Sequence, residues 1–215
     1  MNKKYKFIKG STEKDIMNKR RYEGEQTKQH IINKARILFS QKGYAGTSIE
    51  DICAASECSK GSIYYHFKSK EDLFLYLAEQ AFKESWEQWE KKSSQCESVT
   101  EKLYGFGDHF VSTLQRPLNK AGEEFINRVG TDSEVGQKFF AIMNNFMKDF
   151  EKLVSEGISR GEFKREDPKE LAFIILSFYS GLSDSYLFMD KEAMKKLFQK
   201  GTTLLLQGIS NYKGT

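Results

Sequence analysis

The segment TSIEDICAASECSKGSIYYHFKSKEDLF, residues 47–74, constrains the fold more than any other part of the chain. Three signals for the start of a helix occur within it. Thr47 and Glu50 have the spacing of a capping box, Ser59 can cap a second helix, and Ser69 can cap a third. Starts so close together leave room only for short helices in the first two positions. The segment therefore predicts a helix, a tight turn, a short helix, a turn and the beginning of a longer helix.

Two short helices at a steep angle form a helix-turn-helix, whose second helix enters the major groove of DNA. At about 100° per residue, Ile63 and Phe67 share one face of that helix and are expected to pack inward. The opposite face is expected to read bases, and the flanking positions to meet phosphates. The alternative is that the adjacent tyrosines belong to the core. The residues predicted to contact DNA are Thr47, Ser48, Ser59, Lys60, Gly61, Ser62, Tyr64, Tyr65, His66 and Lys70.

The segment resembles the DNA-binding domain of TetR-family transcriptional regulators. The resemblance begins at Ile31 and continues through AxxLF at 35–39, GYxxTSIxDI at 43–52 and SKGSxYxHFxSKEDL at 59–73. Within that family, YYHF followed by KSKEDLF is most similar to the multidrug-responsive repressors. The agreement in order and spacing at so many positions makes the resemblance specific.

The chain departs from the family pattern in the turn between the two short helices. Where the family usually has Ala-Gly-Val, this sequence has Ser56, Glu57 and Cys58. A Glu in place of Gly predicts a less standard turn, or strain if its φ is positive. The usual Ala after the Asp-Ile pair is Cys53, a small residue of the kind often found buried.

The resemblance implies an all-α homodimer. An N-terminal three-helix helix-turn-helix domain would be joined by a long helix to a C-terminal helical domain for ligand binding and dimerisation. We expect a flexible basic arm at 1–24, the DNA-binding domain at 25–74 and the ligand-binding and dimerisation domain at 75–215. The helices are expected at about 25–42, 70–92, 99–115, 118–129, 132–159, 168–189 and 191–209, beside the two short ones.

The implied function is that of a ligand-responsive transcriptional repressor. It would bind a palindromic double-stranded operator as a dimer and be released by a small lipophilic or aromatic effector. The alternative is a DNA-binding regulator or nucleoid protein without a small-molecule ligand, whose C-terminal domain binds a protein partner.

Positive charge is concentrated in the N-terminal part of the chain, as binding to a polyanion there would require. Up to Phe74 there are 15 Lys and Arg against 9 Asp and Glu, a net charge of +6, and the remainder carries 19 against 21, a net charge of −2. A basic front favours contact with nucleic acid. Two prolines and 30% charged residues favour a mostly helical chain.

Other classes of protein are disfavoured. No apolar run is long enough to span a bilayer and no signal peptide is recognisable, so we expect a cytoplasmic protein without a membrane partner. We find no catalytic motif and no metal-ligand spacing among His30, His66 and His109, so we expect no catalytic residue, cofactor or metal. Three cysteines without C-x-x-C spacing favour a reduced protein, and a Cys53/Cys58 redox or metal switch is the less favoured alternative.

Aromatic and Met residues are frequent in the C-terminal region, residues 75–215. They predict either an ordinary core or an adaptable pocket for flat apolar ligands. Glu123, Glu124, Asp149 and Asp184 are candidate counter-ions for a cationic ligand. The residues predicted to line the pocket are Trp89, Tyr104, Phe110, Phe125, Met143, Phe146, Met147 and Phe178.

Two helices near the C-terminus are predicted to pair with their copies in a four-helix bundle across a two-fold axis. Small residues spaced four apart allow close helix approach, and the last helix carries a broad apolar stripe. The predicted interface residues are Ser177, Gly181, Ser185, Leu197 and Leu204. The alternative is that these helices close the core of the monomer.

Overall fold

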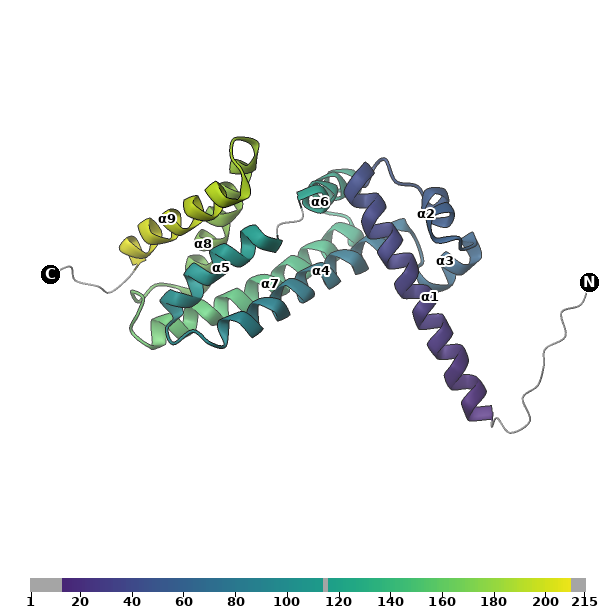
Figure 1. Ribbon diagram of the computed structural model, residues 1–215, viewed down its shortest axis with the longest axis horizontal. Helices are drawn as coiled ribbons and strands as arrows, with labels where there is room; N and C mark the ends of the chain where they lie inside the picture. Colours follow the sequence, from purple (N-terminus) through teal and green to yellow (C-terminus); the bar gives the residue numbers. More distant parts are fainter. Residues whose placement is uncertain (1–12, 114–115, 210–215) are drawn as a thin grey trace, which may run out of the picture. The chain divides into compact units, whose positions relative to one another are not determined.

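The computed structural model describes residues 13–113 and 116–209, and the regular structure in these ranges is entirely helical (Figure 1). This confirms the predicted all-α class. The helices are α1 (Glu13–Lys42), α2 (Ile49–Ser56), α3 (Lys60–His66), α4 (Lys70–Ser93), α5 (Val99–Thr113), α6 (Arg116–Val129), α7 (Glu134–Ser159), α8 (Pro168–Ser183), the 3₁₀ helix η1 (Asp184–Leu187) and α9 (Lys191–Ile209).

The helices form two compact units. The first holds the described residues up to Phe74 together with Pro117–Phe125, and the second holds Leu75–Arg116 and the described residues from Ile126. Helix α4 continues from the first unit into the second without a break. The sequence gives no hint that part of α6 joins the first unit.

Helix α1 begins earlier than expected. Residues 13–24, which we predict to belong to a flexible arm, are helical, and the remainder of that arm lies outside the described residues. No proline interrupts this stretch, and Lys19 pairs with Glu23 at 3.9 Å in the i,i+4 arrangement that supports helices. Met17 and Tyr22 are 68% and 65% exposed, so side-chain burial does not explain this extension.

Gly43 ends α1, and its conformation explains why a glycine is needed there. Its φ is 74°, and a Cβ at this position would collide with a carboxylate oxygen of Glu124. That oxygen accepts a hydrogen bond from the Ala45 backbone N–H at 3.2 Å. Next to this contact, Phe125 packs edge-on against Tyr44 and stacks on Phe74. The α6 residues are therefore part of the core of the first unit.

The capping box of α2 lies one residue later than predicted. Ser48, not Thr47, is the N-cap, and its partner is Asp51 rather than Glu50. The Thr47 hydroxyl instead donates to the Gly43 carbonyl at 2.8 Å, because the chain turns back onto the end of α1. Both Thr and Ser can cap a helix, so the choice between them depends on a contact outside α2.

The turn after α2 is strained at Glu57, as its departure from the family pattern predicts. Its φ and ψ are 54° and 25°, the left-handed conformation that costs a residue with a Cβ about 1–2 kcal/mol. Glu57 is the one non-glycine residue with positive φ in the described part of the chain. Its N–H and that of Cys58 both donate to the Cys53 carbonyl, which closes the turn.

A Glu57→Gly variant is therefore expected to unfold with a free energy about 1 kcal/mol higher than the parent, since glycine adopts this conformation without a steric cost. Urea denaturation of both proteins measures the difference. Glu57→Ala is the control, because it removes the same side-chain groups but keeps the Cβ, and it should gain little. Equal stabilities of the Gly and Ala variants would show that the turn is not strained.

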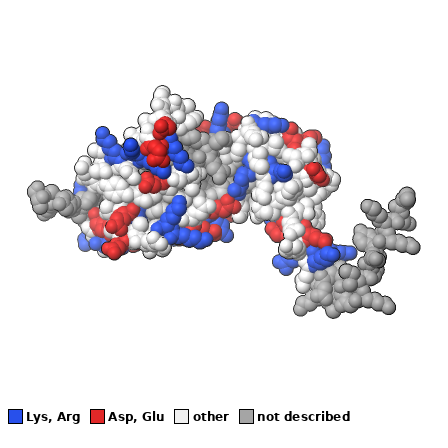
Figure 2. Space-filling model, in the orientation of Figure 1, with Lys and Arg blue, Asp and Glu red and all other residues white. Residues whose placement is uncertain are grey.

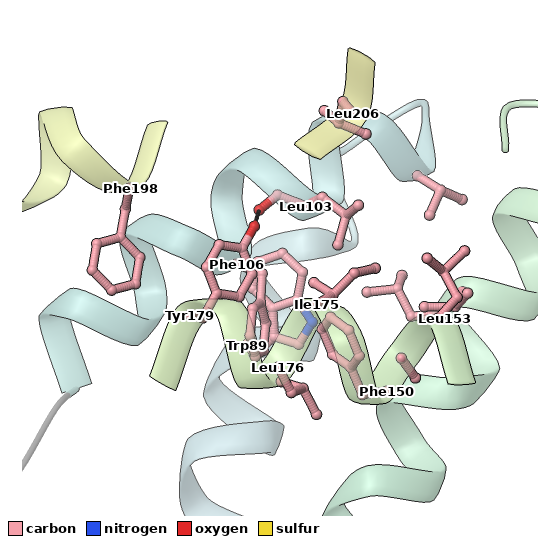
Figure 3. Packing of buried hydrophobic residues seen from close by; sticks show 14 of the residues in the cluster. Trp89, Leu103, Phe106, Phe150, Leu153, Ile175, Leu176, Tyr179, Phe198 and Leu206 are labelled. Carbon is pink, nitrogen blue, oxygen red and sulfur yellow. Dashed lines mark hydrogen bonds between the residues drawn. The ribbon is translucent and has the colours of Figure 1, made fainter. Parts of the chain in front are cut away.

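The second unit is built around one aromatic core (Figure 3). Tyr179 of α8 lies at its centre and donates its hydroxyl hydrogen to the Leu103 carbonyl at 3.1 Å, with Thr202 Oγ1 2.9 Å away. Burial raises the pKa of Tyr179 to about 12. In this core α5 packs on α9 and α7 packs on α8. The predicted helix at 168–189 is shorter, because α8 ends at Ser183 and the chain continues as η1.

Candidate functional site

Helix α3 presents an exposed aromatic face. Ile63 and Phe67 are 0% and 3% exposed and anchor the helix, whereas Tyr65 is 82% and Tyr64 51% exposed. The alternative that the tyrosines are core residues is therefore wrong for the isolated chain. Gly61 is exposed and Ser62 half-buried. An exposed pair of tyrosines can stack on or hydrogen-bond to bases and phosphates without any rearrangement of the helix.

The two capping serines hold α2 and α3 in place. Ser59 Oγ accepts from the Ser62 N–H at 3.1 Å, which fixes the start of α3. Ser48 Oγ donates to the Asp51 carboxylate at 2.6 Å and accepts the Asp51 N–H at 3.0 Å. Lys42, through its 2.8 Å hydrogen bond, and then Ser48 lower the pKa of Asp51 below its ordinary value. Both hydroxyls therefore act as helix caps in the protein without DNA.

Two residues predicted to contact DNA lie elsewhere than expected. Thr47 is 1% exposed, so its side chain is not available to a ligand, and we remove it from the proposed contacts. The Lys70 ammonium donates to the Tyr44 carbonyl at 2.6 Å and lies 4.1 Å from the centre of the Tyr44 ring. Lys70 is thus a structural residue of the first unit.

The charge on this surface is mixed. Lys60, at the first position of α3, forms an ion pair with Glu50 of α2, and both side chains are more than half exposed. Figure 2 shows basic and acidic side chains interspersed on the viewed face. His66 is half-buried and its ring lies edge-on to Tyr65, with 4.9 Å between the centroids. Since the basic groups are partly compensated, the aromatic face is the most distinctive feature of α3.

A groove of about 420 Å³ lies between α4 and α7, which run side by side in the second unit (Figure 1). Phe82 and Trp86 of α4 contact Phe146 of α7, with ring centroids 5.4 and 5.7 Å apart. Acidic residues outnumber basic ones along its walls. The remaining residues that line it are Glu79, Lys83, Glu87, Glu90, Ile142, Asn145 and Asp149. A larger open depression of about 760 Å³ is lined by α7 residues alone and has no aromatic wall.

The residues predicted to line one pocket are not brought together. Phe146 lines the α4/α7 groove, but Trp89 is 2% exposed within the aromatic core, and Tyr104, Phe110, Met147 and Phe178 pack against that core. Met143 is 42% exposed on α7. Phe125 belongs to the core of the first unit and is a wrong prediction. Of the predicted counter-ions, Asp149 lines the groove, and Glu124 instead accepts from Ala45.

An apolar face is exposed on α8, η1 and α9. Ser177, Gly181 and Leu204 of the predicted interface are exposed, and a Cβ at Gly181 would meet no atom within 4 Å. Leu197 and Ser185 are only half-exposed, and Ser185 lies in η1, so the predicted four-residue spacing on one helix is wrong there. The large exposed side chains of this face are Phe173, Ile174, Tyr186, Leu187, Phe188 and Leu204.

His109 of α5 is a buried polar residue to which the sequence assigns no role. It is 3% exposed, with Nε2 2.9 Å from the Ser85 carbonyl oxygen and Nδ1 3.5 Å from Lys92 Nζ. A carbonyl oxygen and an ammonium on opposite sides fix a neutral ring, which donates from Nε2 and accepts at Nδ1. Burial above all lowers the pKa of His109, the Ser85 hydrogen bond opposes the change, and Lys92 adds to it.

The stability of the second unit should consequently fall in mild acid. Above the ordinary pKa of 6.5 the ring is neutral in both folded and unfolded chains, whereas below it the unfolded chain takes up the proton first. We expect the parent to lose more stability between about pH 7.5 and 5.5 than His109→Gln, whose amide still donates but does not titrate. Urea unfolding at the two pH values tests this, and equal losses would contradict it.

Comparisons with known proteins match both units. The family described as "Bacterial regulatory proteins, tetR family" matches residues 31–77, and "QacR-like protein, C-terminal region" matches residues 82–211. The regulator QacR of Staphylococcus aureus is 29% identical over 184 residues, 85% of this chain and 98% of the relative. The negative regulator IcaR of the same species is 25% identical over 182 residues, 83% of this chain and 96% of the relative.

A solved structure of a TetR transcriptional regulator from Chloroflexus aurantiacus superimposes with a TM-score of 0.71 at 27% identity, covering 88% of this chain and 98% of the other. Within residues 13–113 and 116–209, no helix is long and apolar enough to cross a membrane. The matched ranges and the superposition show that the similarity extends over both units. The range 31–77 includes the turn at Glu57.

Proposed function

Because the chain belongs to the TetR family of bacterial transcriptional regulators, which are DNA-binding proteins and not enzymes, we propose that it represses transcription by binding a palindromic operator as a dimer. The observation that carries this proposal is the exposed pair Tyr64 and Tyr65 on a helix whose inward residues are fully buried. The relative IcaR is a negative transcriptional regulator, which supports repression as the sign of the effect.

The proposed contacts are the exposed and half-buried residues of α3 apart from its buried anchor Ile63. Gly61, Ser62 and Tyr65 read base edges, and Lys60, Tyr64 and His66 contact phosphates. In a two-fold dimer, the two α3 helices would enter successive major grooves about 34 Å apart.

Lys60→Ala should weaken binding to every DNA sequence and reduce by about one the slope of log affinity against log salt concentration.

The proposed effector is an aromatic or lipophilic molecule, and the walls of the α4/α7 groove favour one with a positive charge. Phe82, Trp86 and Phe146 offer flat apolar surface, and Asp149 with three glutamates supplies negative charge around it. Such a lining attracts an aromatic cation through both stacking and cation–π contact. Helix α4 carries the groove and leads into the DNA-binding unit, so an effector that repositions α4 would change operator affinity.

The effector part is tested by titrating operator-bound protein with a panel of aromatic cations and matched neutral aromatics, and following DNA release by fluorescence anisotropy. We expect cations of the panel to release the operator, and Trp86→Ala to need about tenfold more of them, as loss of one aromatic contact implies. Met143→Ala, an exposed α7 residue outside the groove lining, is the matched control.

If no compound of the panel changes operator affinity, the effector hypothesis fails. The alternative, a regulator or nucleoid protein whose second unit binds a protein partner, would then be preferred. The operator itself is obtained by in vitro selection from a random duplex library. A selected inverted repeat supports the dimer, whereas recovery without any sequence preference favours the nucleoid alternative.

A further inference from the structure

Two thiols lie on the turn that separates α2 from α3. Cys53 is in the last turn of α2 and Cys58 is the second residue after the end of that helix. Both are free and half-buried. The third cysteine, Cys96, follows α4 in the other unit.

The backbone brings Cys53 and Cys58 together. The Cys58 N–H donates to the Cys53 carbonyl oxygen at 3.2 Å, and the Glu57 N–H donates to the same oxygen. With ordinary bond lengths, such a hydrogen bond keeps the two Cα atoms within about 7 Å. The Cys58 hydrogen bond is the 6→1 bond of a Schellman turn, in which the side chains at these two positions are commonly in contact. Disulfides require Cα atoms about 4.4–6.8 Å apart, so the backbone is already near that range.

We propose that Cys53 and Cys58 form an oxidation site for hydroperoxides, which closes the turn with a disulfide and weakens operator binding. The second part rests on the proposed function. One thiolate attacks the O–O bond of the hydroperoxide and becomes a sulfenic acid while an alcohol or water leaves. The second thiol attacks the sulfenic sulfur, the S–S bond forms and water leaves. The protein loses two electrons and two protons, which the hydroperoxide takes up.

The position of the pair explains why oxidation would affect α3. Cys58 immediately precedes Ser59, whose hydroxyl caps α3 through the Ser62 N–H. Between the two thiols lies Glu57, the strained left-handed residue. A disulfide fixes the two Cβ atoms at about 3.8 Å, and we expect this constraint to act on the turn at Glu57 and on the start of α3. A displaced recognition helix loses base contacts, and loss of even one such contact costs about tenfold in affinity.

The thiol pair is tested on the full-length protein with hydrogen peroxide, followed by alkylation of the remaining thiols and digestion with trypsin. Cleavage after Lys42 and Lys60 leaves both cysteines in one peptide, residues 43–60. We expect this peptide to lose two hydrogens and to escape alkylation, and a thiol reductant to reverse the change. A peptide that remains alkylated at both cysteines, or that gains oxygen without closing, overturns the proposal.

The effect on operator binding is tested by measuring the affinity of four proteins for the DNA duplex recovered by selection, with and without peroxide. Peroxide should lower the affinity of the parent and of the control Cys96→Ser by about tenfold or more, reversibly. Cys53→Ala and Cys58→Ala, checked for folding by circular dichroism, should keep their affinity. An equal loss in all four would place the effect outside the turn and overturn the link to DNA. If no duplex is selected, the proposed function fails, and the peptide mass still decides whether the thiols close.

Discussion

A Tyr65→Ala variant is expected to bind the selected operator about 10- to 100-fold more weakly than the parent and with reduced discrimination against mutated operators. Tyr65 is the most exposed aromatic residue of α3, and its neighbours Ile63 and Phe67 remain to hold the helix. Its removal should therefore leave the fold intact and take away a contact to the bases. Anisotropy titrations against the operator and a set of single-base variants measure both quantities.

Two further variants separate the possible causes. Tyr65→Phe keeps the ring, so an intermediate affinity would identify a hydrogen bond from the hydroxyl. Tyr22→Ala removes a tyrosine that is 65% exposed in the same unit but lies on α1, and it should leave sequence discrimination unchanged. Unchanged affinity and discrimination in Tyr65→Ala would show that α3 does not read the operator through this face.

An Ile174→Asp variant is expected to lose operator affinity by about 100-fold or more, since a monomer forfeits the second half-site and the gain from linked binding. Ile174 is 56% exposed on α8 beside Phe173, which is 61% exposed. A carboxylate placed between two such faces would have to be buried unpaired, which strongly disfavours the dimer. Sedimentation velocity measures the dimer, and anisotropy measures the operator affinity of the same samples.

Phe140→Asp is the matched control, because Phe140 is a partly exposed aromatic on α7 of the same unit, 39% accessible. It should remain dimeric and retain its affinity. A dimeric Ile174→Asp protein would exclude the α8 face as the dimer interface. A monomeric one with full operator affinity would instead contradict binding as a dimer.

Local patterns account for what the sequence predicts well. Ser59 caps α3 and Ser69 accepts the Asp72 N–H at 3.2 Å at the start of α4, because a cap depends only on residues within one turn. The inward residues Ile63 and Phe67 follow in the same way from helical periodicity. Strain at Glu57 follows from one residue type at one turn position.

Contacts between distant segments account for what the sequence misses. Glu124 meets Ala45 across 79 positions, and His109 meets Ser85 across 24, so neither contact leaves a periodic trace. The rear aromatics show the same limit. Helical spacing marks Phe146 and Phe150 equally, yet Phe150 is 0% exposed in the core while Phe146 lines the groove. Only the packing of α7 against its neighbours separates the two roles.

The position of the two tryptophans on α4 makes the protein its own optical reporter. Trp86 and Trp89 are the only indoles of the sequence, and both belong to the second unit. Trp86 is half-buried in the groove and Trp89 is 2% exposed, so a soluble quencher should dim the first and spare the second. Coupling between two ligands is reciprocal. An effector that weakens operator binding must therefore itself bind more weakly, by the same factor, when the operator is present. A change of indole emission on adding unlabelled operator alone would thus reveal communication between the units before any effector is known.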